Sequence, residues 1–221
     1  MDEFELITRN ENFEMDFFSF LRSLANSFRV AYITSSRDEL QQMCHDKDIS
    51  DSPFFNIFSN LPLRPFSRDE AIELVTVPSE HEGVPLGSYA EKLIDLAGLF
   101  PFYLQMACCS LFDHLTDDPD AEPNWKNVTE MFEEEALPHY SFIWEKFDDS
   151  EKSNMSKIAS GKSIDRKFHF VNENLVRRGY LIETDAGPLL CSDSFRNFVL
   201  RSGDVQTGRG RFSSLLGKFK I

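Results

Sequence analysis

Apolar side chains recur at helical spacing along much of the chain, with two β-rich stretches near its start. Residues 13–27 carry phenylalanine and leucine three and four positions apart, which predicts a helix with one apolar face. Residues 28–34 are apolar and rich in β-forming residues, which predicts a buried strand. A short helix is expected over 38–44, a loop with an aromatic segment over 46–60, and a second short strand over 61–66.

A group of helices is predicted over residues 67–116. Ser67 and Glu70 have the spacing of a capping box, in which the serine accepts a backbone N–H and the glutamate reaches back to the serine. We expect the helix that they begin to run to about Val75 and to be ended by Pro78.

A second amphipathic helix is predicted over 88–97, and a third from Pro101 to about residue 115. Gly98 breaks the pattern between them, and Pro101 suits the first turn of a helix, where a missing N–H costs nothing. The polar, acidic, proline-bearing stretch 116–123 predicts a domain boundary.

Residues 124–202 show the order of elements of a winged-helix domain, a helix-turn-helix variant. A long helix is expected over about 125–147, interrupted near Pro138. Two shorter helices, a two-stranded hairpin and a last helix should follow, over about 150–160, 168–178, 180–191 and 193–201.

Charge and hydropathy narrow the class of protein. The 221 residues carry a formal net charge of −14, and residues 201–221, with five basic residues and one acidic residue, are at +4, which leaves −18 on the rest. An acidic body repels nucleic acid, so a nucleic-acid partner is not expected. No run reaches the roughly 18 apolar residues of a membrane span. The acidic N-terminus is unlike a signal peptide, so we expect a cytoplasmic protein.

The tail, residues 203–221, has apolar residues at the spacing of an amphipathic helix, namely Phe212, Leu215, Leu216 and Phe219. With its flanking basic residues, the stretch 211–220 could bind an anionic membrane or a partner. It could equally be a linker or a helix docked on the acidic body. We otherwise expect protein partners or self-association, because the strand over 28–34 would have open edges.

The candidate chemistry begins with two adjacent acids, Asp2 and Glu3, which resemble the metal-binding end of a strand in nucleotide hydrolases. Such enzymes also need a Gly-x-x-x-x-Gly-Lys-Ser/Thr loop, whose backbone N–H groups hold the phosphates. None of the 10 glycines lies in that pattern. The four cysteines lack Cys-x-x-Cys spacing and the five histidines lack metal-type spacing, so no other metal site is predicted.

Five segments of the chain occur in a characteristic order: Asp2–Glu5, Ile33–Arg37, Ser52–Phe55, Leu63–Ala71 and Ala97–Gln105. In this order they resemble the motifs of STAND-type ATPases of bacteria and archaea, which are relatives of the AAA+ family. The resemblance covers most of residues 1–200. It implies the α/β remnant of a P-loop NTPase core with a helical lid, followed by a mostly α winged-helix domain. The implied boundaries are 1–66 for the core, 67–116 for the lid, 124–202 for the winged helix and 203–221 for the tail.

The resemblance also implies roles for single residues. Asp2 would hold Mg²⁺, Glu3 would polarise the attacking water, and Arg37 would face the phosphates as a cation. Thr34 or Ser35 would be the polar sensor near the γ-phosphate, and Gly98 and Pro101 would form the lid motif beside the nucleotide. The implied function is an ATP-dependent signalling switch in a longer parent protein, with ATP and Mg²⁺ as cofactors. Without a phosphate loop, this chain alone is expected neither to hydrolyse ATP nor to hold a cofactor.

These assignments have plainer alternatives. The two acids can be solvated residues at a chain end, Arg37 can pair with Asp38 or Glu39, and Pro101 can serve only to start a helix. The rival function is a non-enzymatic regulatory module or a DNA-binding winged helix. DNA-reading versions carry basic and amide side chains on the third helix, but here that helix has a glutamate among its exposed positions. We therefore favour the role that the resemblance implies for the winged helix, which is to pack against the ATPase core and relay its state.

Overall fold

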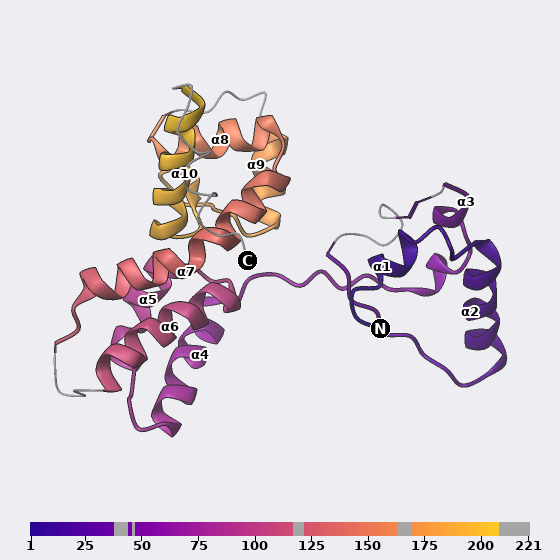
Figure 1. Ribbon diagram of the computed structural model, residues 1–221, viewed down its shortest axis with the longest axis horizontal. Coiled ribbons are helices and arrows are strands. Elements are labelled where there is room, and N and C mark those ends of the chain that lie inside the picture. The colour runs from indigo at the N-terminus through magenta and orange to yellow at the C-terminus, as the bar shows by residue number, and fades with distance from the viewer. Residues whose placement is uncertain (38–43, 46, 117–121, 163–168, 208–221) are drawn as a thin grey trace, which may run out of the picture. The chain divides into compact units, whose positions relative to one another are not determined.

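The computed structural model describes residues 1–37, 44–45, 47–116, 122–162 and 169–207. The chain divides into two compact units, Met1–Leu63 and Arg64–Ile221 (Figure 1). The helix expected over 38–44 and the amphipathic helix expected in the tail fall almost entirely outside the described residues, as does most of the expected boundary over 116–123.

The first unit is built around packed aromatic rings. Its helices are α1 (Glu5–Thr8), α2 (Met15–Ser27), α3 (Lys47–Ser50) and the 3₁₀ turn η2 (Phe55–Ile57). The prediction of an amphipathic helix over 13–27 is confirmed by α2, whose apolar face buries Phe18. The Phe54 ring lies 5.9 Å from that of Phe18 and 6.2 Å from that of Phe4, measured between centroids. Phe4 is fully buried, so the core anchors the acidic start of the chain.

Neither of the two predicted strands forms. In the stretch 28–34, the Val30 N–H donates to the Phe28 carbonyl at 2.8 Å, which closes a three-residue turn where a strand would have to stay extended. The predicted burial is also wrong, because Ile33 is 86% exposed. Residues 61–66 likewise form no strand. β-forming side chains make a strand only where a neighbouring strand pairs with it, and the described residues of this unit supply none.

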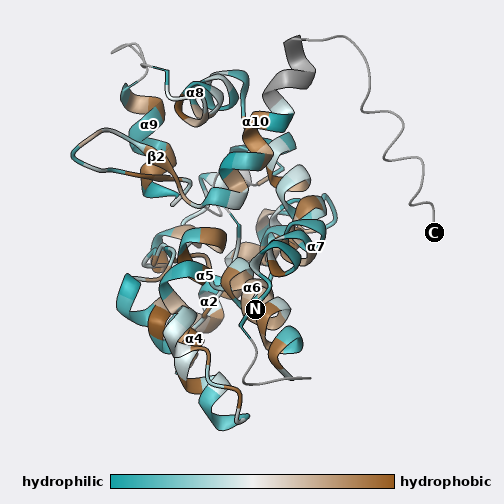
Figure 2. Ribbon diagram, turned by 90° about the vertical axis from the view of Figure 1, so that its left-hand side faces the viewer, coloured by the Kyte–Doolittle hydropathy of each residue, from teal (hydrophilic) through white to brown (hydrophobic). Residues whose placement is uncertain are grey.

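The second unit is mostly helical around one hydrophobic core. Its elements are α4 (Arg68–His81), the 3₁₀ turn η3 (Gly87–Tyr89), α5 (Ala90–Ala97), α6 (Pro101–Thr116), α7 (Trp125–Lys146), α8 (Asp149–Ala159), α9 (His169–Arg177), β1 (Leu181–Ile182), β2 (Leu189–Leu190) and α10 (Asp193–Thr207). The core runs from α4 to α10 without a break, and α7 contacts both α6 and α10 (Figure 1). Teal and brown residues alternate along α4, as expected of a helix with one buried face (Figure 2).

Two helices run through prolines, so the predictions that Pro78 ends one helix and that Pro138 interrupts another are wrong. An interior proline costs a helix about 3 kcal/mol, because it removes one hydrogen bond and crowds the preceding turn. Packing of the residues around each proline into the core outweighs that cost. The buried neighbours are Val75 and Ser79 in α4 and Ala136 and Tyr140 in α7.

The predicted capping box at the start of α4 is confirmed. The Ser67 hydroxyl accepts the Glu70 N–H at 3.3 Å, and the Glu70 carboxylate accepts the Ser67 N–H at 2.7 Å. The pKa of Glu70 lies below its usual range, chiefly because the Ser67 N–H donates to the carboxylate and secondly because the hydroxyl does. The stabilisation of the folded unit by the ionised Glu70 carboxylate is therefore fully present above the pKa that Glu70 has in the unfolded chain. It is lost as the pH falls through the lower pKa that Glu70 has in the folded chain.

Replacing Ser67 with alanine should destabilise the second unit by about 1 kcal/mol, the usual value of an N-cap. Both tryptophans, Trp125 and Trp144, lie in α7, so tryptophan fluorescence during urea unfolding reports on this unit alone. Ser67→Asp should keep most of the stability, because aspartate also caps helices. An equal loss in both variants would contradict the capping role.

The predicted hairpin is confirmed, although its strands are short. β1 and β2 pair antiparallel, with Leu181 opposite Leu190 and Ile182 opposite Leu189. Gly179, at a φ of 82°, carries the chain from α9 into β1, and an added Cβ there would meet Pro65 Cγ at 2.2 Å. The element order α7, α8, α9, hairpin, α10 matches the order predicted for this region. Within the described residues, no helix combines the length and the apolar character that crossing a bilayer requires.

Candidate functional site

Backbone hydrogen bonds hold the first residues of the chain beside Ile33 and Ser35. The Met1 amine donates to the Ile33 carbonyl at 2.7 Å, and the Ser35 N–H donates to the Met1 carbonyl at 3.0 Å. The Phe4 N–H then donates to the Ser35 carbonyl at 3.0 Å. The predicted sensor residues, Thr34 and Ser35, therefore lie beside the predicted acidic pair.

Asp2 is held as a carboxylate by two donors. The Ser35 hydroxyl and the Glu3 N–H both donate to its Oδ1, the latter at 3.0 Å. The pKa of Asp2 is lowered, first by the Ser35 hydroxyl and then by the Glu3 N–H. The Asp2 side chain is therefore ionised at neutral pH, and it stands in contact with solvent.

Glu3 is held in an uncommon backbone conformation. Its φ of 46° lies in the left-handed region, which costs a residue with a side chain about 1 kcal/mol. Such conformations persist where the surroundings enforce them, often at functional sites. The Glu3 side chain meets Arg37, whose Nη2 donates to Oε1 at 2.8 Å. The structure thus joins the predicted catalytic residues in one ion pair.

Glu5 is a member of this cluster that the sequence analysis missed. Its Oε1 lies 3.7 Å from the Arg37 Nε, and the residue is 4% exposed. Glu5 lies in the acidic run at the start of the chain, but the four-residue helix α1 is too short for a periodicity that would mark it as facing inward. The alternative partners Asp38 and Glu39 lie outside the described residues.

Gly98 and Pro101 belong to the second unit and have structural roles there. Gly98 has a φ of 82°, and an added Cβ would lie 2.7 Å from the Cys191 carbonyl oxygen. Only glycine allows this approach of the loop between α5 and α6 to the end of β2. Pro101 is the first residue of α6, as its helix-start alternative predicts. Of the seven predicted site residues, the structure brings together the five in the first unit: Asp2, Glu3, Thr34, Ser35 and Arg37.

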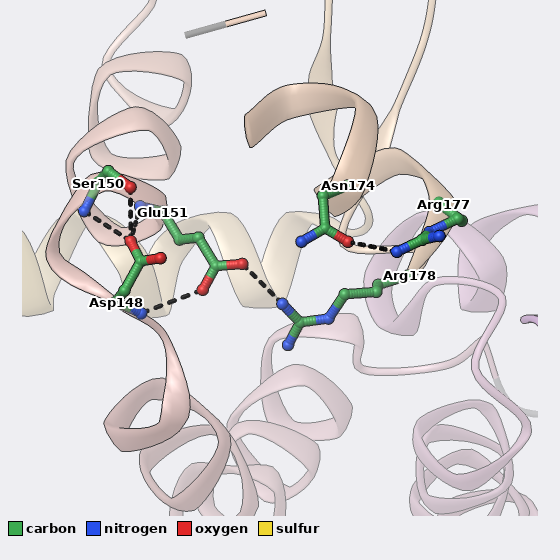
Figure 3. Close-up of polar contacts among 6 residues, drawn as sticks. All are labelled: Asp148, Ser150, Glu151, Asn174, Arg177 and Arg178. Atoms are coloured by element: carbon green, nitrogen blue, oxygen red, sulfur yellow. Dashed lines mark hydrogen bonds and ion pairs between the residues drawn. The ribbon is translucent and has the colours of Figure 1, made fainter. Parts of the chain in front are cut away.

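The two arginines at the end of α9 differ in their surroundings. Arg178 Nη1 donates to Glu151 Oε1 at 2.6 Å (Figure 3). The guanidinium also lies 5.0 Å from the Phe147 ring centroid. The other Glu151 oxygen accepts the Asp148 N–H at 3.0 Å, within the capping box of α8. Arg177 donates only within its own helix among the described contacts, to Asn174 at 3.2 Å. One of these two arginines is therefore already engaged in holding the end of α9 to α8.

A hollow of about 620 Å³ lies between α9, β1 and the start of the second unit. Its lining includes two cations, Arg64 and Arg177, and two anions, Glu173 and Glu183. Charges of both signs give such a surface no preference for phosphate. The prediction that this region reads DNA poorly stays a prediction.

Comparison with known proteins bears on both units. A family model described as novel STAND NTPase 2 (nSTAND2) matches residues 1–164. The chain belongs to this family. The matched residues contain the acidic cluster, the Gly98 loop and all of α8, and they confirm the resemblance to STAND-type NTPases. No curated protein and no solved structure matches the chain.

Proposed function

We propose that this nSTAND2 protein contributes to an ATP-dependent conformational switch. Asp2 holds Mg²⁺, Glu3 polarises the attacking water, and Arg37 faces the phosphates. The observation that carries the proposal is the joining of these residues and Ser35 in one hydrogen-bonded cluster. Phosphoryl transfer fits such a set, because it needs neutralised charge and a positioned water rather than covalent help.

The donor set suits Mg²⁺ shared with a nucleotide. Mg²⁺ keeps several waters and binds through one or two carboxylates plus phosphates. Asp2 offers an ionised, solvent-exposed carboxylate, steadied by the Ser35 hydroxyl. Among the described residues, no group of three or more histidine, cysteine, aspartate or glutamate side chains could hold a metal ion. The site therefore fits a cation that arrives with ATP better than a cage made by the protein alone.

The remaining assignments complete the switch. Thr34 or Ser35 senses the γ-phosphate, and Gly98 and Pro101 form a lid motif at the nucleotide. Residues 124–202 form a winged helix that relays the state of the core to protein partners. The hydrophobic core of the second unit, which is continuous from α4 to α10, supports this relay. Because the Gly98 loop packs closely against the Cys191 carbonyl, a movement of the loop would displace Cys191 as well. ATP affinity requires a phosphate-binding segment, which no glycine pattern in this sequence supplies.

The isolated chain should bind Mg-ATP more weakly than about 10 μM, or about −7 kcal/mol, because backbone N–H groups and a lysine normally supply much of the triphosphate affinity. Calorimetry measures this affinity. Mn²⁺ with ATP locates the site, since the paramagnetic ion broadens nearby amide signals in NMR spectra. We expect broadening centred on residues 2–4 and 35–37.

Asp2→Asn should remove that broadening, because an amide is a poor ligand for a hard cation. The matched control is Asp16→Asn, an exposed acid on α2, which should leave it unchanged. Broadening that survives in the Asp2 variant, or that centres elsewhere, would rule out Asp2 as the metal ligand.

A further inference from the structure

The guanidinium of Arg37 faces two carboxylates that differ in their exposure to water. Its Nη2 donates to Glu3 Oε1 at 2.8 Å, whereas its Nε lies 3.7 Å from Glu5 Oε1. The Glu3 side chain is 49% exposed and that of Glu5 is 5% exposed. Arg37 therefore makes its short hydrogen bond to Glu3, whose exposed carboxylate water could solvate even without Arg37.

Glu5 has less compensation than a buried carboxylate requires. The distance of 3.7 Å to Arg37 exceeds that of a hydrogen bond. Its Oε2 is buried and has no hydrogen-bond partner among the residues that the structure describes. Burying a charge is costly unless it is paired and hydrogen-bonded, whereas an exposed ion pair contributes little. The geometry therefore favours a second position of the guanidinium, closer to Glu5.

We propose that Glu5 is a positioning residue that takes over Arg37 when Glu3 releases it. In the resting chain, Arg37 occupies a Glu3 oxygen that would otherwise accept a hydrogen bond from water. When Glu3 engages the attacking water, a step that rests on the proposed function, the guanidinium moves onto Glu5. Arg37 can serve either carboxylate because its planar fork carries several N–H donors. Only ion pairs change in this step.

The movement of the Arg37 guanidinium from Glu3 to Glu5, called the hand-over below, can be tested without any nucleotide. The test follows the Nε–H signal of Arg37 in ¹H–¹⁵N NMR spectra of the full chain. Glu3→Gln removes the competing charge and should draw the guanidinium onto Glu5. The Nε–H faces Glu5, so a shorter hydrogen bond there should move its proton signal downfield. Glu11→Gln, an exposed acid of the same unit, is the matched control and should leave the signal in place.

The double variant Glu3→Gln/Glu5→Gln should abolish the downfield shift. An unchanged signal in Glu3→Gln, or a shift that persists in the double variant, would overturn the proposal. Adding Mg-ATP to the wild-type chain separates this inference from the proposed function. The Mg-ATP concentration is one at which Mn²⁺ with ATP broadens the signals of residues 2–4. A shift in the same direction then supports both, whereas a response to Glu3→Gln with none to Mg-ATP would overturn the nucleotide role of Glu3 and leave the movement of Arg37 to Glu5 standing.

Unfolding equilibria give a second measurement that does not depend on assigning one signal. The coupling between Arg37→Gln and Glu5→Gln in a double-mutant cycle should strengthen when residue 3 is glutamine, by about threefold or more in the unfolding constant. If the coupling were the same with glutamate and glutamine at position 3, Arg37 would not be shared between the two carboxylates, and the proposal would fail.

Discussion

Replacing Gly98 with alanine should lower the free energy of unfolding of the second unit by about 3 kcal/mol, from two separate costs. At a φ of 82° and a ψ of −168°, a conformation that essentially only glycine adopts, any residue with a Cβ strains the backbone by about 1–3 kcal/mol. The new Cβ would also lie 2.7 Å from the Cys191 carbonyl oxygen and 3.3 Å from the Ser192 Cβ. A backbone oxygen cannot move aside by changing a rotamer, so β2 or the loop must shift.

Tryptophan fluorescence during thermal unfolding should show a midpoint lower by about 6–12 °C for a unit of this size. Gly161→Ala is the matched control, because Gly161 also has a positive φ, 68°, but among the described residues no atom beyond its chain neighbours lies within 4 Å of the added Cβ. It should cost about 1 kcal/mol, the backbone term alone. Equal losses in the two variants would show that the contact with Cys191 is unimportant.

This result would change how the lid motif is tested. A Gly98 variant that lost a response to nucleotide would be losing its fold as well, so the loss would not identify a nucleotide contact. Pro101 is the better probe, because it is the first residue of α6, where a replacement breaks no helical hydrogen bond, and we expect its variants to keep the fold. The family match covers both residues but does not separate the two roles.

The helices of this chain were predictable because their signals are local. The aromatic spacing that marks α2 and the Ser67–Glu70 capping box each lie within a few turns, and the structure contains both. The strand over 28–34 was not predictable, because a strand depends on partners distant in sequence. The amino-acid composition of 28–34 does not show whether the chain stays extended at Val30 or forms the turn in which Val30 bonds to the Phe28 carbonyl. The same dependence on tertiary packing let α4 and α7 continue through their prolines.

The candidate site divides in the same way. The order of motifs placed Asp2, Glu3, Ser35 and Arg37 in one expected site, and the structure joins them by hydrogen bonds and ion pairs. The residues that the sequence analysis missed are distinguished by their burial in the structure. Glu5 differs from its acidic neighbours only in facing the core, and no pattern in a four-residue helix shows that. Likewise, the sequence does not distinguish the adjacent arginines Arg177 and Arg178 at the end of α9, although of the two only Arg178 reaches a buried partner.

Arg178→Ala should destabilise the second unit by about 2 kcal/mol. Removing one partner of a fully buried pair costs about 3–5 kcal/mol, because the other charge stays buried alone. Glu151 has a side chain only 9% exposed, but that of Arg178 is 38% exposed, so water reduces the loss. The capping-box bond from Asp148 to Glu151 remains in the variant. Tryptophan fluorescence during urea unfolding measures the change.

Arg177→Ala is the matched control one residue away, and it should change the stability by no more than about 0.5 kcal/mol, since its contact lies within its own exposed helix face. Equal effects of the two substitutions would contradict the anchoring role of Arg178. The comparison also bears on the rival function. A DNA reader would need both arginines at the phosphates, but detaching Arg178 from Glu151 would leave the largely buried Glu151 carboxylate without its ion-pair partner. If Arg178→Ala is strongly destabilising and Arg177→Ala is not, DNA binding through both arginines would require a stabilising ion pair to be broken, and this result would favour the proposed relay over the rival function.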